Sequence, residues 1–213
     1  PTKNLTSKGK FVAEYSAIKN QTYVPFNQNM KDQKILEDIT NRLNNVLALP
    51  ENVAVTFADC GVPNAFYNPQ NKSITVCYEF MDLFYNIFLK MGKDEKEANQ
   101  AMYGATTFFF LHELGHALID VYDLPATGRE EDSADQLSTY ILMDEMGKDG
   151  RVAAVDGALI FEALSKGETA EAQTFADEHS LSSQRYYNLL CWMYGKDQGQ
   201  YGFVEKEELL PES

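Results

Sequence analysis

The sequence predicts an α+β fold in which a small antiparallel or mixed sheet with helices precedes a mainly helical second half. Short alternating β-branched segments lie in the first third of the chain, helical periodicity follows, and one long helical segment is apolar on nearly every side. The chain has 213 residues, 44% of them hydrophobic, which is enough for a well-packed core. We expect one domain over residues 1–213, with an N-terminal α+β lobe at about 1–125 and a helical C-terminal lobe at about 126–213.

The first elements follow from hydrophobic spacing. Phe11–Ile18 alternates moderately and predicts a strand. Apolar residues at helical spacing then predict a helix from Met30 to Leu49, which Pro50 ends. Asn52–Ala58 is β-branched and alternating, and therefore predicts a second strand.

A hairpin and two helices are predicted next. Residues 64–67 and 73–78 flank a turn-rich Asn-Pro-Gln-Asn segment, which indicates a hairpin. The pattern then becomes helical at about 81–90 and again at about 95–122. The second of these helices is apolar all round near its middle, as a buried central helix would be.

The last part of the chain is predicted to be helical throughout. Thr127 followed by Glu130 predicts a capping box, which starts a helix near Gly128 and carries it to about Met146. Three or four shorter helices then fill residues 151–210.

The chemistry of the chain is concentrated in residues 112–116, which read His-Glu-Leu-Gly-His and contain two of its three histidines. Positions i and i+4 of a helix share a face, so both imidazoles can bind one metal ion. Glu113 lies beside them, where it can take a proton from a water that the metal activates.

Such a metal site needs a third protein ligand and an open position for water. Glu131 and Asp135 lie one turn apart on the next predicted helix, so one can bind the metal while the other fixes the tautomer of a ligating imidazole. The alternative is that these acidic residues only favour the positive end of a helix. Two imidazoles and one carboxylate favour zinc, with iron, cobalt and nickel left open by ligand type.

These residues resemble the zincin metallopeptidases, specifically the gluzincin branch to which thermolysin belongs, in which H-E-x-x-H on one helix precedes E-x-x-x-D on the next. The resemblance implies a zincin-like fold and one Zn²⁺ ion held by His112, His116 and Glu131. It also implies that Asp135 hydrogen-bonds a histidine ligand and that Glu113 is the general base. The two motifs are closer together here than in thermolysin, so Asp132 is a rival to Glu131.

Two further segments carry roles by the same resemblance. Residues 64–67, Asn-Ala-Phe-Tyr, are similar to the Asn-Ala-Phe-Trp edge strand of thermolysin-like enzymes, where Asn64 and Ala65 would hold the substrate as an added strand; a packed hairpin is the alternative. His179, two residues after Asp177, or a nearby tyrosine would assist the oxyanion of the transition state; this similarity is one of role, without a shared motif, and a surface histidine is the alternative. Arg185 would bind a substrate carbonyl or carboxylate, or pair with a carboxylate of the protein.

Most of the chain also resembles an uncharacterised bacterial family of metallopeptidases. The shared features are the Cys-Gly and Asn-Ala-Phe-Tyr hairpin, Cys-Tyr-Glu at 77–79, the stretch 112–135, and the late Gln184-Arg185 and Cys191-Trp192. The resemblances imply a zinc metallopeptidase that hydrolyses a peptide or protein substrate. The alternatives are a catalytically silent zincin-like domain that binds a metal or a partner, and a helical scaffold in which the motif is accidental.

The net charge and the cysteines restrict the possible partners and the cellular location of the protein. A net charge of −14 argues against binding nucleic acid or anionic lipid, and no apolar stretch is long enough to span a bilayer. The sequence does not predict whether the protein is a monomer or an oligomer. Cys60 and Cys77 are either bridged, which would indicate an oxidising compartment, or buried free thiols. Because the chain starts at Pro1, we expect an exported bacterial protein, periplasmic or extracellular, whose signal segment was removed.

Overall fold

The computed structural model describes residues 8–167, 180–206 and 209. By its internal contacts the chain forms two compact units, one of residues 1–83 and 116–125 and the other of residues 84–115 and 126–213. Two helices, α3 (Tyr78–Lys90) and α4 (Glu95–Tyr122), each contribute residues to both units.

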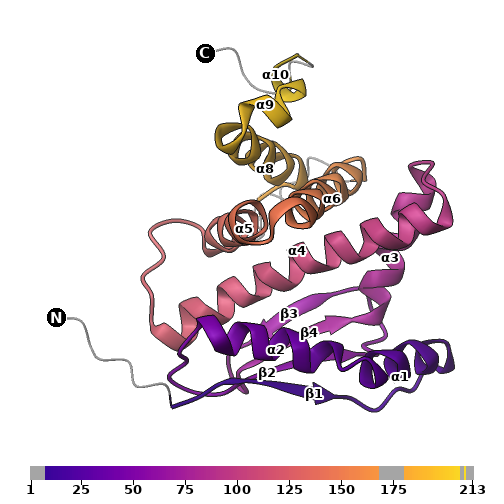
Figure 1. The fold of residues 1–213 in the computed structure, drawn as a ribbon, viewed down its shortest axis with the longest axis vertical. Coiled ribbons are helices and arrows are strands. Elements are labelled where there is room, and N and C mark those ends of the chain that lie inside the picture. The colour runs from indigo at the N-terminus through magenta and orange to yellow at the C-terminus, as the bar shows by residue number, and fades with distance from the viewer. Residues whose placement is uncertain (1–7, 168–179, 207–208, 210–213) are drawn as a thin grey trace. The chain divides into compact units, whose positions relative to one another are not determined.

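The first unit contains a four-stranded mixed sheet in the order β1-β2-β4-β3 (Figure 1). β1 pairs with β2 and β2 with β4 in parallel, whereas β3 is antiparallel to β4, so β1 and β3 are the edge strands. The small mixed sheet and the α+β class are therefore confirmed. The strands are β1 (Phe11–Tyr15), β2 (Val53–Ala58), β3 (Ala65–Asn68) and β4 (Ser73–Cys77).

The register explains the sequence pattern. Val55, at the centre of β2, lies opposite Ala13 of β1 and Ile74 of β4, and it is fully buried. The hairpin is confirmed as well, because Ala65 pairs with Val76 and residues 69–72 connect the two strands.

The helical segment of this unit differs from the prediction. A short 3₁₀ turn, η1 (Gln21–Tyr23), leads into α1 (Val24–Asp32), and α2 (Ile35–Val46) follows. The single helix expected from Met30 to Leu49 is therefore wrong, because Met30 belongs to α1. Lys34 separates the two helices with a φ of 54°, a left-handed conformation that interrupts helical hydrogen bonding. α2 then packs beside β1, where the Asn44 amide bonds the N–H and C=O of Phe11.

A disulfide closes the loop between β2 and β3. Cys60 is bonded to Cys77, at the end of β4, and the Glu79 carboxylate accepts hydrogen bonds from the N–H groups of Cys60 and Gly61. The structure thus has the bridged form of the two alternatives that the sequence left open.

The second unit is helical. α6 runs beside α8, and α8 also packs on α5 (Figure 1). Aromatic rings fill its interior, where Phe109 of α4 contacts Phe84, Phe108 and Phe161. Within the described residues, no helix has the length and apolar character that crossing a bilayer requires. The helices of the second unit that follow α4 are α5 (Glu130–Tyr140), the π-helical turn η2 (Ile141–Glu145), α6 (Gly147–Ser165), α8 (Ser182–Lys196), α9 (Gln198–Tyr201) and α10 (Phe203–Lys206).

The start of α5 corrects another prediction. The helix begins at Glu130 rather than near Gly128, and its N-cap residue, Arg129, makes no side-chain capping bond. The capping box of Thr127 is therefore wrong, because the last extended residue before the helix is Arg129, two positions later than Thr127. Three acidic residues in the first turn, which complement the helix dipole, favour this start instead.

One buried carboxyl in this unit gives a prediction about pH. Asp156 on α6 is 5% exposed, and a side chain on Gly104 of α4 would collide with it. Burial raises the pKa of Asp156 from 3.8 to about 7, with the charge of Lys93 opposing the shift. The folded protein thus binds this proton more tightly than the unfolded chain, so the free energy of unfolding should fall as pH rises from about 4 to about 7.

Asp156→Asn removes this dependence because the amide never ionises. Above pH 7 the variant should be more stable than the wild type by roughly 3–4 kcal/mol, and the gain should vanish as the pH approaches 4. Urea unfolding across this pH range measures it, with Asp149→Asn, an exposed aspartate on the same helix, as control. A constant difference between the Asp156 variant and the wild type at every pH would contradict the account.

Candidate metal centre

The two histidines of the motif are held by the long helix α4. His112 is 3% exposed and Glu113 is 7% exposed, while His116 one turn later is partly exposed. Since α4 is continuous from Glu95 to Tyr122, the predicted i, i+4 spacing of the imidazoles on one helix face is present.

Gly115 lets the next helix approach α4 closely. A Cβ built on Gly115 would lie 2.9 Å from the Cα of Ala134 and 3.0 Å from its Cβ. No larger residue fits there without moving a backbone. Because Ala134 lies between Glu131 and Asp135 in sequence, this contact brings both carboxylates of α5 to the histidine helix.

The third candidate ligand lies next to the first. Oε2 of Glu131 is 3.0 Å from Nε2 of His112, and Glu131 is 8% exposed. Ligand atoms of His112, His116 and Glu131 all lie within 4.8 Å of one another. Asp132, the rival, is not in this group, and its Oδ1 accepts a hydrogen bond from Ser180.

Asp135 contacts the other nitrogen of the same imidazole. Its Oδ1 lies 2.8 Å from Nδ1 of His112, and Asp135 is 1% exposed. The carboxylate also accepts two hydrogen bonds from Arg185 of α8, from Nε and from Nη2, each 2.7 Å long. The guanidinium in turn lies over the ring of Phe161, 4.2 Å from its centroid, so α5, α6 and α8 meet at this side chain.

The charges around Asp135 fix the tautomer of His112. Burial alone would raise the pKa of Asp135, but the hydrogen bonds with His112 and Arg185 outweigh it and hold the pKa below 3.8. Asp135 is therefore an acceptor, and Nδ1 of His112 carries the hydrogen that it receives. The lone pair of the neutral imidazole is then at Nε2, facing Glu131.

This arrangement fits a cation. A lone pair on Nε2 and a carboxylate oxygen 3.0 Å away are both acceptors, so they repel unless positive charge lies between them. In the protein alone a proton can supply it: burial lowers the pKa of His112, but hydrogen bonds with Asp135 and Glu131 raise it above 6.5 overall. A metal ion can replace that proton, because two ligands at zinc distances in a tetrahedral site are about 3.3 Å apart.

The other residues predicted from the sequence are placed as follows. Asn64 and Ala65 belong to the first unit, where Ala65 begins the edge strand β3 and the Asn64 carbonyl accepts from the N–H of Cys77. Arg185 is 7% exposed and pairs with Asp135, which is the second of the two roles that the sequence left open for it. His179 lies outside the described residues.

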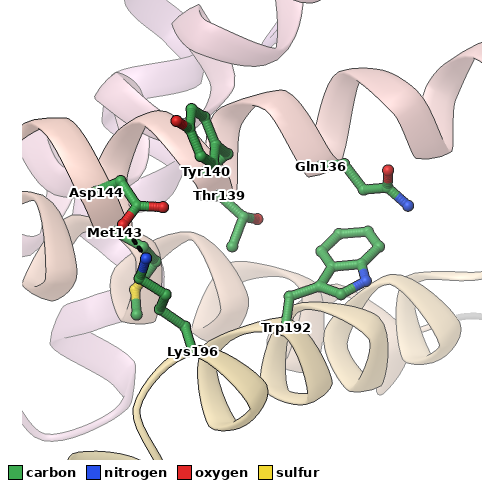
Figure 2. Close-up of a pocket in the computed structure, with 7 residues that line it drawn as sticks. All are labelled: Gln136, Thr139, Tyr140, Met143, Asp144, Trp192 and Lys196. Carbon is green, nitrogen blue, oxygen red and sulfur yellow. Dashed lines mark ion pairs between the residues drawn. The ribbon is translucent and has the colours of Figure 1, made fainter.

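A pocket of about 340 Å³ lies elsewhere on the second unit, between α5–η2 and α8 (Figure 2). Lys196 of α8 and Asp144 of η2 form an ion pair at one end of it, and Trp192 of α8 faces the α5 side (Figure 2). None of the residues predicted to bind the metal, the substrate or a transferred proton lines this pocket. The pocket is therefore not part of the candidate metal centre. Its lining residues are Gln136, Thr139, Tyr140, Met143, Asp144, Trp192 and Lys196.

The model of a protein family described as "Putative metallopeptidase" matches residues 15–213, which is most of the chain. No curated protein and no solved structure matches.

The close approach at Gly115 gives a testable prediction. Gly115→Ala keeps every candidate ligand but forces α5 away from α4, so zinc affinity should fall, and overpacking should cost about 1–3 kcal/mol of stability. Chelator-competition titration and urea unfolding measure the two effects. Gly195→Ala on α8 is the matched control, because a Cβ there meets nothing within 4 Å and should be neutral or stabilising. Unchanged zinc affinity in Gly115→Ala would show that the helix approach does not matter.

The pairing of Arg185 gives a second prediction. Arg185→Met leaves the Asp135 carboxylate buried without its guanidinium, which should cost about 3–5 kcal/mol in the free energy of unfolding. Arg151→Met is the control, because Arg151 pairs with Asp197 where both side chains are 32% exposed, and should cost less than about 1 kcal/mol. Similar losses in the two variants, measured by urea unfolding, would argue against a special role for Arg185.

Proposed function

The chain belongs to this metallopeptidase family, and from that premise we propose that it is a zinc-dependent hydrolase of peptide bonds. The observation that carries the proposal is the grouping of His112, His116 and Glu131, whose ligand atoms lie within 4.8 Å of one another. Two imidazole nitrogens and one carboxylate are the protein ligands in one class of open, catalytic zinc sites. The gluzincin resemblance, with Glu131 as third ligand, belongs to the same proposal.

A zinc ion at this site would supply a Lewis acid that acidifies a water molecule and polarises the scissile carbonyl. Glu113, next to the first histidine, is the general base in this scheme. It takes a proton from the attacking water and returns it to the leaving amine. Glu113 is 7% exposed, so bulk water has little access to its carboxylate, which supports a proton transfer from a water held beside it.

Asp135 and Arg185 act on the ligand rather than on the substrate. Asp135 holds the hydrogen of His112 on Nδ1, which puts the lone pair of the neutral ring on Nε2, the nitrogen that would bind the metal. Arg185 neutralises the buried carboxylate and fixes its orientation with two hydrogen bonds.

The substrate is a peptide or protein segment. In the proposal, Asn64 and Ala65 hold it as an extended strand, and the position of Ala65 in the edge strand β3 supports this, since an edge strand can accept a further strand. His179 assists the oxyanion, as the sequence resemblance implies.

The proposed location is outside the reducing cytoplasm. The Cys60–Cys77 disulfide supports it, because such bonds persist in the periplasm and in extracellular space.

Glu113→Gln tests the function directly. The variant should bind one equivalent of zinc like the wild type, yet cleave a peptide library at least about 100-fold more slowly, because only the proton transfer is lost. Glu131→Gln should lose zinc affinity, and Glu130→Gln, at the start of the same helix, should retain both zinc and activity.

The possible outcomes separate the alternatives. Cleavage by Glu113→Gln at the wild-type rate would rule out the general-base role. A wild-type protein that carries zinc and cleaves nothing in the library would be a silent zincin-like domain. A wild-type protein that retains no stoichiometric metal would show that the histidine motif is accidental.

A further inference from the structure

Asp120, near the C-terminal end of α4, joins that helix to the β3–β4 hairpin. Its Oδ2 accepts a hydrogen bond from the Tyr67 hydroxyl, at 2.5 Å, and pairs with the Lys72 ammonium, at 2.7 Å. All three residues belong to the first unit. We call Asp120, Tyr67 and Lys72 the Asp120 cluster.

The Asp120 cluster lies close in sequence to two residues of the proposed function. Asp120 is one turn beyond His116, which is about 6 Å along the helix axis. Tyr67 is two residues beyond Ala65 in β3, about 7 Å along the strand, and the two side chains share a face of the sheet. One carboxylate therefore fixes the strand proposed to hold the substrate onto the helix that carries a proposed metal ligand.

The Asp120 cluster is held by charge-assisted hydrogen bonds. Both donors act on one carboxylate, and charge-assisted hydrogen bonds are about twice as strong as neutral ones. Lys72 is 25% exposed and also lies 3.8 Å from Glu51, so its charge is shared between two carboxylates. Hydrogen bonds with Lys72 and Tyr67 outweigh the effect of burial and lower the pKa of Asp120, so the carboxylate stays ionised at neutral pH.

Lys72 has a strained backbone conformation. Lys72 has a φ of 53°, in the left-handed region that glycine and asparagine adopt most easily. A lysine at such a position is strained relative to glycine. From this turn position the Lys72 ammonium reaches Asp120, and the ion pair opposes that strain.

We propose that the Asp120 cluster positions the edge strand β3 relative to His116 and so aligns an extended peptide substrate with this proposed metal ligand. The proposal rests on the proposed function and adds three positioning residues to it. The rival explanation is that the cluster only stabilises the fold. Both explanations predict lower stability when the cluster is broken, but only positioning predicts a specific loss of substrate binding.

Tyr67→Phe tests the proposal, because it removes one hydrogen bond and keeps the ring. We expect KM for an internally quenched peptide to rise about 5- to 10-fold, with kcat within about 2-fold and zinc affinity unchanged. Lys72→Met should act in the same direction, and Lys72→Arg should restore most of the loss. Hydrogen exchange of the β3 and β4 amides, which needs no turnover, should accelerate in Tyr67→Phe.

Tyr15→Phe is the matched control. The Tyr15 hydroxyl also bonds a carboxylate, Oε2 of Glu37 at 2.7 Å, but Tyr15 lies in β1, the opposite edge strand. It should lower stability by a similar amount without changing KM. An equal rise of KM in both variants, or none in Tyr67→Phe, would overturn the positioning role while leaving the peptidase function intact.

Failure of the proposed function has a different signature. A wild-type protein that cleaves no peptide contradicts the peptidase, and hydrogen exchange then decides the remaining part of the inference. Unchanged exchange of the β3 amides in Tyr67→Phe would show that the cluster does not hold the strand.

Discussion

The metal centre depends on one buried carboxylate, that of Asp135. Asp135 is 1% exposed, so ionising its carboxyl group would be costly without partners. Arg185 and His112 are these partners, because both donate hydrogen bonds to the carboxylate. The same bonds determine which imidazole nitrogen of His112 carries its hydrogen. Nε2 therefore faces Glu131, and because its lone pair and the carboxylate oxygen are acceptors 3.0 Å apart, a proton or a metal ion has to lie between them. The hydrogen bonds of Asp135 thus determine that Nε2 of His112, which faces the Glu131 carboxylate, is the imidazole nitrogen available to a metal ion.

Backbone packing makes this network possible. Glu131 and Asp135 reach His112 because Gly115 and Ala134 are small enough for α4 and α5 to touch. The glycine is one of the two residues that a H-E-x-x-H pattern leaves unspecified, so in this chain an unspecified position has a structural requirement of its own. α8 completes the site by bringing Arg185 to Asp135, with the ring of Phe161 of α6 against the guanidinium.

Local sequence patterns predicted the strands and helices that depend on residues close together in the chain. The alternation of β2, the hairpin around residues 69–72 and the full extent of α4 were all predictable, because burial on a strand or helix face leaves a periodic record in sequence. The break at Lys34 was not, since apolar spacing continues across it while the backbone turns left-handed. The capping box at Thr127 failed because several residues there could have preceded the first turn, and Arg129 does.

Contacts between distant residues were harder to predict. The H-E-x-x-H and E-x-x-x-D spacings indicated His112, His116, Glu131 and Asp135 as a group, and three of these ligand candidates lie together in the structure. Arg185 was singled out but given two possible partners, because nothing in its own segment marks the carboxylate 50 residues away. Tyr67 and Asp120, 53 residues apart, carried no signal, since tyrosine in a strand and aspartate near a helix end are both common.

X-ray absorption at the zinc edge, on wild-type protein loaded with one equivalent of zinc and then dialysed, tests the central claim most directly. The account predicts that zinc is retained, with nitrogen and oxygen ligands at about 2.0–2.1 Å and outer-shell scattering from two imidazoles. Loss of the metal on dialysis, or a spectrum without imidazole scattering, would contradict it.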